Sequence, residues 1–386
     1  MVCVFTFFFL CLYSKTLHPK RTHTGTGMRL TSSDEKQNAF AFDKVFDENA
    51  TQEDVFEEVS ELVQSALDGY NVCVFSYGQT GSGKTWTMQG NVNDEKTRGL
   101  IPRSVEQIVK SADTLRTDGW EWNLTGQFLE IYNEKIRDLL ATKKSSKDEI
   151  TYAIKTDSKG RKSVTNLRRV KLDTTEQVAG LMRIASENRS VACTEMNAVS
   201  SRSHSVFTLN LQGIHKEHNI ELNGSLHLVD LAGSERLSRS KAQGKNLRET
   251  KNINKSLSCL ADVFMALREK RSHVPYRNSK LTYLLQECFS KDGKTMMLVN
   301  VSPTMKSYPE TLCSLRFAKQ VNQTELGRAK ARVSRAEGNE DSSSSSAGNT
   351  KKRKESPVKT KGKKGSLKKP RRDVGGVAGK RRSRKK

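Results

Sequence analysis

One short stretch constrains the fold of this chain more than any other feature. It reads Gly78-Gln79-Thr80-Gly81-Ser82-Gly83-Lys84-Thr85. The stretch fits the pattern G-x-x-x-x-G-K-[ST] and follows the apolar run Val72–Tyr77, which we expect to be a buried strand. Glycines in such a loop let backbone N–H groups converge on phosphate oxygens, and the N-terminus of a following helix adds its dipole. Because a strand precedes the loop and a helix is plausible after it, the stretch predicts a phosphate site rather than a flexible glycine-rich turn.

The last two residues of this stretch supply the chemistry that a nucleoside triphosphate requires. The ammonium group of Lys84 would bridge the β- and γ-phosphates. The hydroxyl group of Thr85 would bind Mg²⁺. The sequence therefore predicts a nucleotide and a divalent cation at the same loop.

A second motif follows another apolar run and complements the first. Asp230-Leu231-Ala232-Gly233-Ser234-Glu235 places a carboxylate and then a glycine after Leu226–Val229. This order suits a carboxylate, Asp230, that holds an Mg²⁺-bound water, and a backbone N–H at Gly233 that senses the γ-phosphate. Upstream, Asn197–His204 collects amide, hydroxyl and guanidinium groups, and alone it is more typical of a polar loop. Together the three segments predict a pair of nucleotide-dependent switches.

The remaining pattern alternates strands and helices, which favours an α/β fold. The alternation in Phe40–Phe46 has the period of a strand, and Thr51 can cap a helix that ends before Gly69. We expect further strands at Trp122–Tyr132, Ser205–Gln212, Leu226–Leu231 and Met296–Val301, and helices at Asn252–Arg268, Lys280–Phe289 and Glu310–Val321.

Positive charge is concentrated at the C-terminal end of the chain. The whole sequence carries +24, and residues 351–386 carry +16 of it, with 18 Lys or Arg against two acids. This tail follows a Ser-rich linker, residues 329–350, and has almost nothing to bury, so we expect it to be disordered. Its clusters Lys351–Lys354 and Lys380–Lys386 are typical of importin recognition, and equally of electrostatic binding to nucleic acid or another acidic polymer. It contains no aromatic residue, so base stacking is excluded.

Cysteine spacing and apolar runs exclude other classes of protein. The seven cysteines form no CxxC pair, which argues against a disulfide scaffold or a close-spaced zinc site. The apolar run Met1–Tyr13 is too short to span a bilayer, and it lacks the basic start and cleavage site of a signal peptide. We therefore predict a cytosolic or nuclear protein without a membrane partner.

The order of these motifs, from about Phe40 to Arg328, resembles the kinesin motor domain. Two further segments carry the resemblance, Phe128–Glu134 (FLEIYNE) and Asn252–Leu257 (NINKSL). The resemblance implies a central mixed β-sheet flanked by helices on both faces, and an ATP-hydrolysing, Mg²⁺-dependent microtubule motor. Three segments most resemble the kinesin-14 group, the minus-end-directed, C-terminal-motor kinesins: Gly99–Arg103, Asp138–Thr142 and Val321–Gly327.

The resemblance also implies roles for the switch residues. Ser201 would join the shell around Mg²⁺ and the lytic water, and Asn197 would line the nucleotide pocket. Arg202 would pair with Glu235 when the γ-phosphate is present, which closes one switch on the other. Trp86 stands where the family stacks an aromatic ring or a histidine on adenine, although ordinary core packing is the alternative.

The N-terminal segment departs from the family pattern. Kinesins open their sheet with a strand that ends in Arg-x-Arg-Pro, and residues 1–39 contain no such motif. We therefore expect the first strand and part of the adenine pocket to be missing. This departure keeps open a second function, a microtubule-binding protein with impaired hydrolysis. A third alternative is a basic nuclear protein that binds nucleic acid through its tail alone.

The family resemblance also points to a microtubule-binding surface. Basic residues lie on and on both sides of the helix expected at Asn252–Arg268, and in kinesins this helix moves with the second switch and docks on tubulin. The residues we assign to this surface are Lys241, Lys245, Lys255, Arg271, Arg277 and Lys280. Tubulin is acidic, so these cations would speed the encounter and make it salt-sensitive. The loops Thr142–Lys147 and Lys159–Lys162 would add a second contact, and the sequence predicts no oligomeric state.

Overall fold

The computed structural model of this chain describes the parts that carry the motifs above. Described are residues 6–11, 17–22, 25–31, 37–141, 150–158, 160–195, 201–235 and 245–335. The chain divides into two units, residues 1–337 and 338–386, and everything described below belongs to the first. The linker and tail assignments from residue 336 onward lie outside the described residues and stay predictions.

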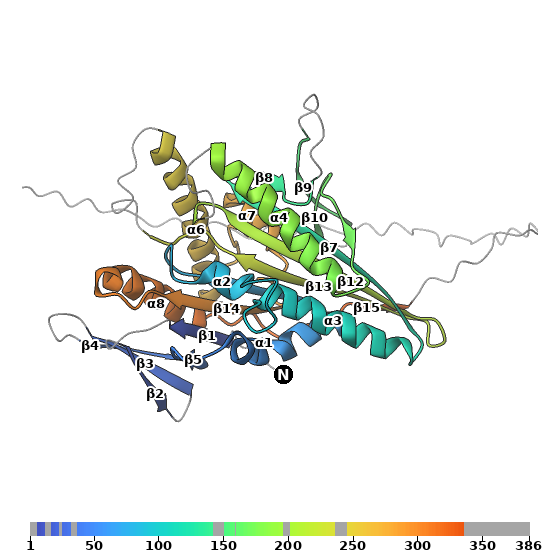
Figure 1. Ribbon diagram of the computed structural model, residues 1–386, viewed down its shortest axis with the longest axis horizontal. Coiled ribbons are helices and arrows are strands. Elements are labelled where there is room, and N and C mark those ends of the chain that lie inside the picture. Colours follow the sequence, from blue (N-terminus) through green and yellow to red (C-terminus); the bar gives the residue numbers. More distant parts are fainter. Residues whose placement is uncertain are drawn as a thin grey trace, which may run out of the picture. The chain divides into compact units, whose positions relative to one another are not determined.

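A mixed β-sheet forms the centre of the first unit (Figure 1). Its strands lie in the order β11-β7-β12-β13-β6-β14-β1-β5, with β8 paired to β7 and β15 paired to β13. The pairs around β6, β14 and β1 are parallel, whereas β7, β12 and β13 pair antiparallel. The strands are β1 (Thr6–Cys11), β5 (Lys44–Phe46), β6 (Asn71–Tyr77), β7 (Trp120–Tyr132), β8 (Lys135–Asp138), β11 (Val170–Lys171), β12 (His204–His215), β13 (Ile220–Asp230), β14 (Gly293–Val301) and β15 (Val333–Arg335).

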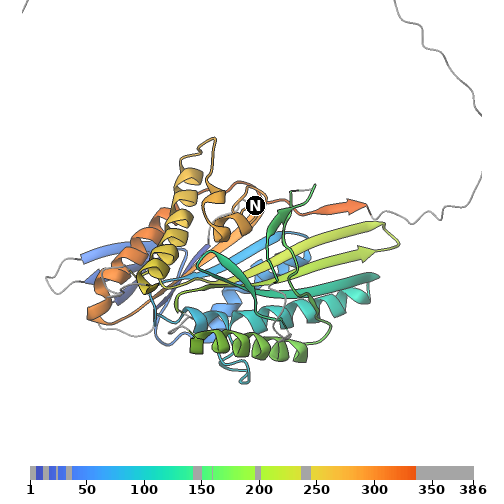
Figure 2. The same cartoon turned by 90° about the horizontal axis from the view of Figure 1, so that it is seen from above.

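Helices cover both faces of this sheet, as Figure 2 shows with gold and orange helices on one side and teal and green ones on the other. Each face has its own hydrophobic core. Residues of β6 alternate between the two cores because successive side chains of a strand point to opposite faces: Val72 and Val74 lie in one, Cys73 and Phe75 in the other. The helices are α1 (Gln52–Leu67), α2 (Lys84–Met88), α3 (Leu100–Arg116) and α4 (Glu176–Glu195) on the first face, and α6 (Lys245–Arg268), α7 (Lys280–Leu284) and α8 (Tyr308–Asn322) on the second. The α/β fold class is confirmed.

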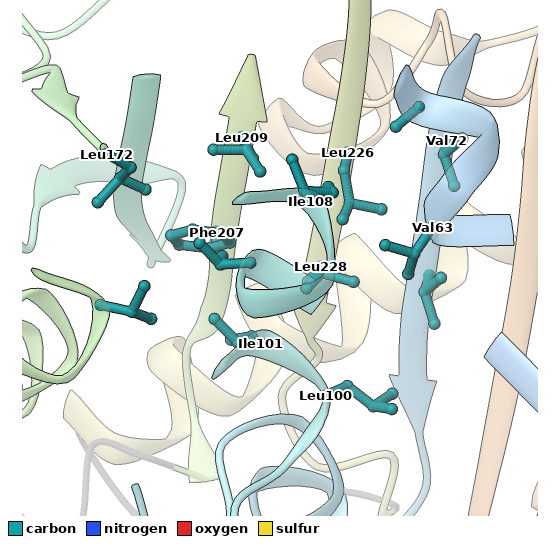
Figure 3. Packing of buried hydrophobic residues seen from close by; sticks show 14 of the residues in the cluster. Val63, Val72, Leu100, Ile101, Ile108, Leu172, Phe207, Leu209, Leu226 and Leu228 are labelled. Carbon is teal, nitrogen blue, oxygen red and sulfur yellow. The ribbon is translucent and has the colours of Figure 1, made fainter. Parts of the chain in front are cut away.

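The first core illustrates how sequence periodicity becomes packing (Figure 3). Leu100, Ile101 and Ile108 of α3 lie over Phe207 of β12 and Leu228 of β13, and all five are at most 1% exposed. Their spacing along α3 places them on one side of the helix. Burying a side chain of this size stabilises the fold by about 1.5–3 kcal/mol.

Helix α1 begins as its sequence predicts. The hydroxyl of Thr51 accepts from the Asp54 backbone N–H, while the Asp54 carboxylate accepts from the Thr51 backbone N–H. This reciprocal pair is a capping box, which satisfies two otherwise unpaired donors. Gly69 follows the helix with φ of 86°, a conformation that favours glycine.

The structure corrects two expectations about the N-terminal part. The segment Phe40–Phe46 bends at Asp43, so it forms two strands that belong to different sheets. The second of them, β5, pairs with β1, and β1 also pairs in parallel with β14. The sheet position that we expected to be vacant is thus filled, because backbone hydrogen bonds need only a run with strand propensity and not an Arg-x-Arg-Pro motif.

Smaller elements complete the described part. A separate three-stranded sheet contains β2 (Leu17–Thr22), β3 (Gly25–Thr31) and β4 (Gln37–Phe42), and a two-stranded hairpin contains β9 (Ile154–Thr156) and β10 (Lys162–Val164). Within the residues described, no helix is both long and apolar enough to cross a membrane.

Candidate functional site

The loop between β6 and α2 has the geometry of a phosphate-binding loop. Strand β6 ends at Tyr77, and α2 begins at Lys84 with Gly83 as its N-cap. A Cβ atom on Gly78 would lie 2.0 Å from the carbonyl oxygen of Asn300, so only glycine fits between the loop and β14. The close approach fixes where the loop leaves the sheet.

Lys84 is held inside this loop. Its side chain is buried, and Nζ donates hydrogen bonds to the carbonyl oxygens of Gly78 and Gln79, both at 2.9 Å. Burial lowers the pKa of Lys84, while Asp230 and Glu235 oppose that shift. The ammonium group is thus placed at the loop and balanced by two carboxylates.

Asp230 and Thr85 meet beside the loop. Strands β13 and β6 are parallel and pair Asp230 with Ser76, so the end of β13 reaches the same sheet edge as the loop. The Thr85 hydroxyl donates to Asp230 Oδ2 at 2.6 Å. A hydroxyl and a carboxylate are oxygen ligands of the kind that Mg²⁺ prefers, so the two residues fit the cation that the sequence predicts.

Asp230 is also part of a buried network around Arg189, which was not predicted from the sequence. Arg189 of α4 lies 3.7 Å from Asp230 Oδ2 and 3.5 Å from Glu130 Oε1. Ser203 donates to Glu130 at 2.6 Å and accepts from Arg189 at 3.3 Å. Glu130 is fully buried, and a charged residue inside the apolar run of β7 was the one available signal for this network.

The structure brings the two predicted switches together at the loop. Gly233 N–H donates to the carbonyl oxygen of Ser201 at 2.8 Å. Glu235 accepts from both the backbone N–H of Thr80, at 2.8 Å, and its hydroxyl, at 2.6 Å. A Cβ atom on Gly233 would lie 2.3 Å from Glu235 Oε2 and 2.4 Å from Thr80 Oγ1, so a larger residue there would displace the Glu235–Thr80 contact. Both switches therefore contact each other or the phosphate loop.

Three other predicted residues have different outcomes. Arg202 is half-buried beside Ser201, and its ion pair with Glu235 in the ATP-bound state stays a prediction. Asn197 lies outside the described residues. Trp86 is 44% exposed, which excludes core packing, and its carbonyl oxygen accepts from Gln52. Adenine stacking on Trp86 stays a prediction.

His204 is a buried residue whose contacts sequence reasoning missed. Its Nδ1 accepts from the backbone N–H of Ala232 at 3.0 Å, and its Nε2 lies 2.6 Å from the hydroxyl of Ser256 on α6. Burial, reinforced by Lys84 and Arg189, lowers the pKa of His204 to about 3. The ring is therefore neutral near pH 7.

Exposed and half-buried cations gather on the second face of the unit, on α6, α7, the segment between these helices and the β9–β10 hairpin. Lys255, Arg271 and Arg277 are exposed and Lys280 is half-buried. Lys162 lies 4.3 Å from the ring centre of Tyr283, and Arg277 lies 5.8 Å from the same ring. We call these residues the basic face: Lys162, Lys255, Arg271, Arg277 and Lys280. Lys241 and the Thr142–Lys147 loop lie outside the described residues, and Lys245 begins α6 but its side chain is not described.

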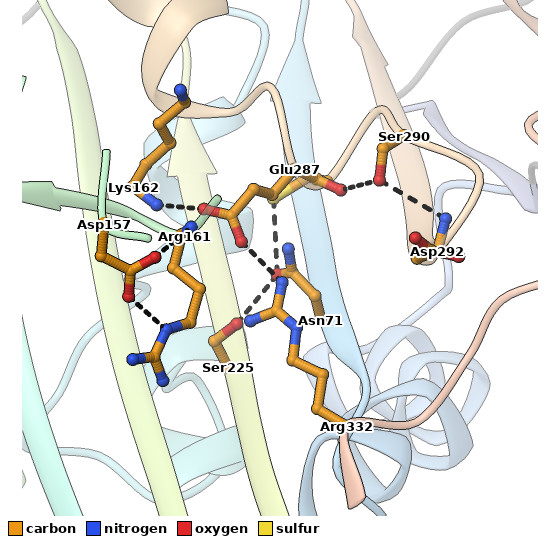
Figure 4. A network of polar contacts seen from close by, with 10 residues as sticks. Asn71, Asp157, Arg161, Lys162, Ser225, Glu287, Ser290, Asp292 and Arg332 are labelled. Atoms are coloured by element: carbon orange, nitrogen blue, oxygen red, sulfur yellow. Dashed lines mark hydrogen bonds and ion pairs between the residues drawn. The ribbon is translucent and has the colours of Figure 1, made fainter. Parts of the chain in front are cut away.

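A polar cavity of about 410 Å³ lies away from the phosphate loop, over β7, β12 and β13. Two ion pairs, each at 2.6 Å, stand at its wall: Asp157 with Arg161, and Glu287 with Arg332 (Figure 4). Polar residues of those strands, among them Thr125, Gln127 and Asn210, line much of it. None of the predicted nucleotide-site residues lines it.

Comparisons with known proteins agree with this geometry. A family model for the kinesin motor domain matches residues 13–324, which begins upstream of the boundary expected at Phe40. The chain is 51% identical to Kinesin-like protein KIN-14N of Oryza sativa subsp. japonica, over 78% of this chain and 40% of that protein. It is 51% identical to Carboxy-terminal kinesin 2 of Xenopus laevis, over 76% of this chain and 46% of that protein.

Solved structures give the same result. The motor domain of Saccharomyces cerevisiae Kar3 superposes with a TM-score of 0.73 at 42% identity, covering 82% of this chain and 99% of that one. The predicted resemblance to the kinesin-14 group is confirmed by these relatives. The chain spans about two fifths of the length of the KIN-14 relatives that it matches.

Proposed function

The chain belongs to the kinesin motor domain family, and from this premise we propose that it is a microtubule-stimulated ATPase of the kinesin-14 type. The observation that carries the proposal is the meeting of three segments at one sheet edge. Thr85 contacts Asp230, Gly233 contacts Ser201, and Glu235 contacts Thr80. A phosphate loop with two switches in contact is what a γ-phosphate-dependent movement requires.

In the proposed reaction, the chain's residues bind and orient ATP rather than form covalent bonds with it. The N–H groups of the loop Gly78–Thr85 cradle the phosphates, and Lys84 exchanges its carbonyl partners for phosphate oxygens. Thr85 and Ser201 would hold Mg²⁺ directly and Asp230 through water, and the cation would neutralise charge that develops on the phosphates. Phosphoryl transfer of this kind depends mainly on positioning and electrostatic stabilisation.

The switches would convert the state of the phosphate into movement. Glu235 accepts hydrogen bonds from the backbone N–H and the hydroxyl of Thr80 in the structure. With ATP bound, Glu235 would leave Thr80 and pair with Arg202, while the Gly233 N–H would leave Ser201 for the γ-phosphate. Glu235 would thereby exchange two hydrogen bonds with Thr80 for an ion pair, and Gly233 would exchange one hydrogen bond for another, so neither group is left unpaired in either state.

The partner that we propose is the microtubule, bound through the basic face together with Lys241 and Lys245. Its exposed cations complement an acidic polymer. A related structure, a KIF14 dimer with AMP-PNP in complex with a microtubule, has a TM-score of 0.76 at 32% identity and covers 86% of this chain. Minus-end direction would follow from the kinesin-14 resemblance, and a spindle or nuclear location from the basic tail.

The tail supports a second, additional interaction. Residues 351–386 carry +16 without an aromatic residue, so they would bind an importin, nucleic acid or the microtubule itself through charge. The alternative of a hydrolysis-impaired binding protein is less well supported, because Lys84, Thr85 and Asp230 are all present and lie together at the phosphate loop.

The ATPase activity of the purified chain, measured with and without microtubules, tests the proposal. We expect low turnover alone and a rise of at least tenfold with saturating microtubules. Microtubule co-sedimentation without any ATP turnover would favour the hydrolysis-impaired alternative. A chain that neither binds microtubules nor hydrolyses ATP would contradict both functions.

A further inference from the structure

The side chain of His204 joins the second switch to helix α6. His204 is the first residue of β12, directly after the first switch. Its Nδ1 accepts from the N–H of Ala232, which lies between Asp230 and Gly233. Its Nε2 meets the Ser256 hydroxyl at 2.6 Å, on the helix that carries the exposed Lys255. One ring therefore touches the nucleotide side and the proposed microtubule side.

The direction of both hydrogen bonds follows from the chemistry of the ring. A backbone N–H can only donate, so the Nδ1 that faces Ala232 is the acceptor. A neutral imidazole carries one proton, and that proton must then lie on Nε2 and point to Ser256. The result is a directed chain of hydrogen bonds from Ala232 through His204 to Ser256.

Burial makes this chain costly to break. His204 is 2% exposed, Ser256 is 3% exposed and Ala232 is fully buried. A donor that loses its partner at such a depth finds no water to replace it. When the segment around Gly233 moves, the His204 ring must move with Ala232 or lose the hydrogen bond from its N–H. If the ring moves, α6 must move with it or lose the hydrogen bond between His204 and Ser256.

We infer that His204 is a positioning residue that transmits movement of the Ala232–Gly233 segment to α6 through Ser256. The inference rests on the proposed function, because it assigns to one side chain the coupling between ATP and the microtubule. A purely structural role for His204 would predict something different: substitutions there would lower the stability of the fold but leave the coupling between ATP and the microtubule intact.

The chain contains a matched control for that distinction. Thr208 of β12 and His227 of β13 form another histidine–hydroxyl pair, at 3.0 Å. Within the part of the chain that the structure describes, neither side chain of this pair hydrogen-bonds to α6 or to the second switch. Thr208→Val keeps the shape of the side chain and removes a comparable hydrogen bond, so it reproduces the structural loss alone.

Three substitutions separate the two halves of the link. Ser256→Ala removes the acceptor on α6 and leaves the bond from Ala232 in place. His204→Asn offers an oxygen near the position of Nδ1 but cannot reach Ser256. His204→Gln offers a donor near the position of Nε2 but no acceptor for Ala232. If the link is real, Ser256→Ala adds nothing further when combined with His204→Asn.

The test measures hydrogen exchange and ATPase activity on the same full-length variants. In Ser256→Ala we expect the Ala232 amide to exchange about fivefold faster, although the Ser256 hydroxyl does not touch it, and the ratio of microtubule-stimulated to basal ATPase to fall about fivefold. Thr208→Val should change neither the exchange rate of Ala232 nor the ATPase ratio, although it should lower the melting temperature by about as much as Ser256→Ala does.

Unchanged exchange at Ala232 in Ser256→Ala would overturn the inference, and so would an equal effect of Thr208→Val. Absence of stimulation in the wild-type chain would instead overturn the proposed function. In that case the exchange measurement still decides whether His204 links the two elements.

Discussion

The nucleotide site and the basic face both depend on cations, but they use them in opposite ways. Lys84 is 7% exposed, and its partners lie within hydrogen-bond distance. Arg271 and Arg277 are exposed, and their nearest described partners are a neighbouring glutamate and a tyrosine ring. In the site, Lys84 and Asp230 are shielded from water, so geometry decides their interaction energy. On the basic face, the charges are solvated and screened by salt.

This difference predicts how each region responds to change. Removing a buried charge leaves its partners unsatisfied, so a single substitution should have a large effect that salt does not alter. Removing an exposed charge should have a small effect that depends on salt and on the number of charges removed. The predictions below test this contrast, from the largest expected effect to the smallest.

Lys84→Ala should abolish ATP turnover, by about 10³-fold or more, because the phosphates lose the one cation that the loop itself supplies. The chain should still fold, since the ammonium group takes no part in the hydrophobic cores. Turnover assays and a circular-dichroism melt check both statements. Lys110→Ala, an exposed lysine of α3, is the control, and near-normal turnover of Lys84→Ala would remove the phosphate-loop assignment.

Glu235→Ala should lose microtubule-stimulated hydrolysis, by about 10²-fold, while nucleotide affinity changes little. The substitution removes the carboxylate that Thr80 contacts in the structure, and with it the predicted partner of Arg202 in the ATP state. Fluorescent-nucleotide binding and stimulated ATPase measure the two effects separately. Glu325→Ala, which removes an exposed carboxylate, should leave both unchanged. Weak nucleotide binding with stimulation retained would contradict the predicted role of Glu235 as a latch.

Lowering the pH should reduce the free energy of unfolding more in the wild-type chain than in a variant that lacks the His204 imidazole. The folded pKa of His204 is about 3, below the unfolded value of about 6.5, so the unfolded chain binds the extra proton. Its contribution to stability is therefore present above pH 6.5 and falls by about 1.4 kcal/mol per unit as pH decreases toward 3. Urea unfolding at several pH values gives the free energy of unfolding as a function of pH. This free energy should fall less steeply with decreasing pH in His204→Gln than in the wild-type chain, and an equal pH dependence would contradict the burial argument.

Neutralising Arg271, Arg277 and Lys280 together should weaken microtubule affinity only about three- to tenfold at low salt. Basal ATPase should not change, because none of the three contacts the nucleotide site. Co-sedimentation at several salt concentrations measures the affinity and its slope. Neutralising Lys110, Arg116 and Lys216 removes the same charge elsewhere, so an equal loss in that control would show that net charge, not the basic face, binds the track.

The sequence predicts the first of these regions better than the second. The phosphate loop, Asp230 and Gly233 are contiguous motifs whose chemistry needs specific residue types, and the structure brings them together at one sheet edge. A basic surface has no such pattern. Lys162 joins it only because the β9–β10 hairpin lies against α7, a contact between segments far apart in the sequence.

The buried support of the site escaped the sequence for a related reason. Arg189, Glu130 and His204 occupy one helix and two strands. Arg189 and His204 are by themselves typical of ordinary positions, and Glu130 stands out only as a charged residue in an apolar run. Their roles depend on long-range pairing, such as Ser205 opposite Glu130 in the sheet register. The Arg-x-Arg-Pro motif does not predict β1, because residues 1–39 lack it. The strand propensity of Thr6–Cys11 is the signal that indicates β1.

The most direct test of the contrast measures ATPase activity against microtubule concentration at low and near-physiological salt. We predict that the maximal rate stays constant, because it reports on the buried site, while the microtubule concentration for half-maximal rate rises at least several-fold as the basic face is screened. A maximal rate that falls with salt while the half-maximal concentration stays constant would contradict the account.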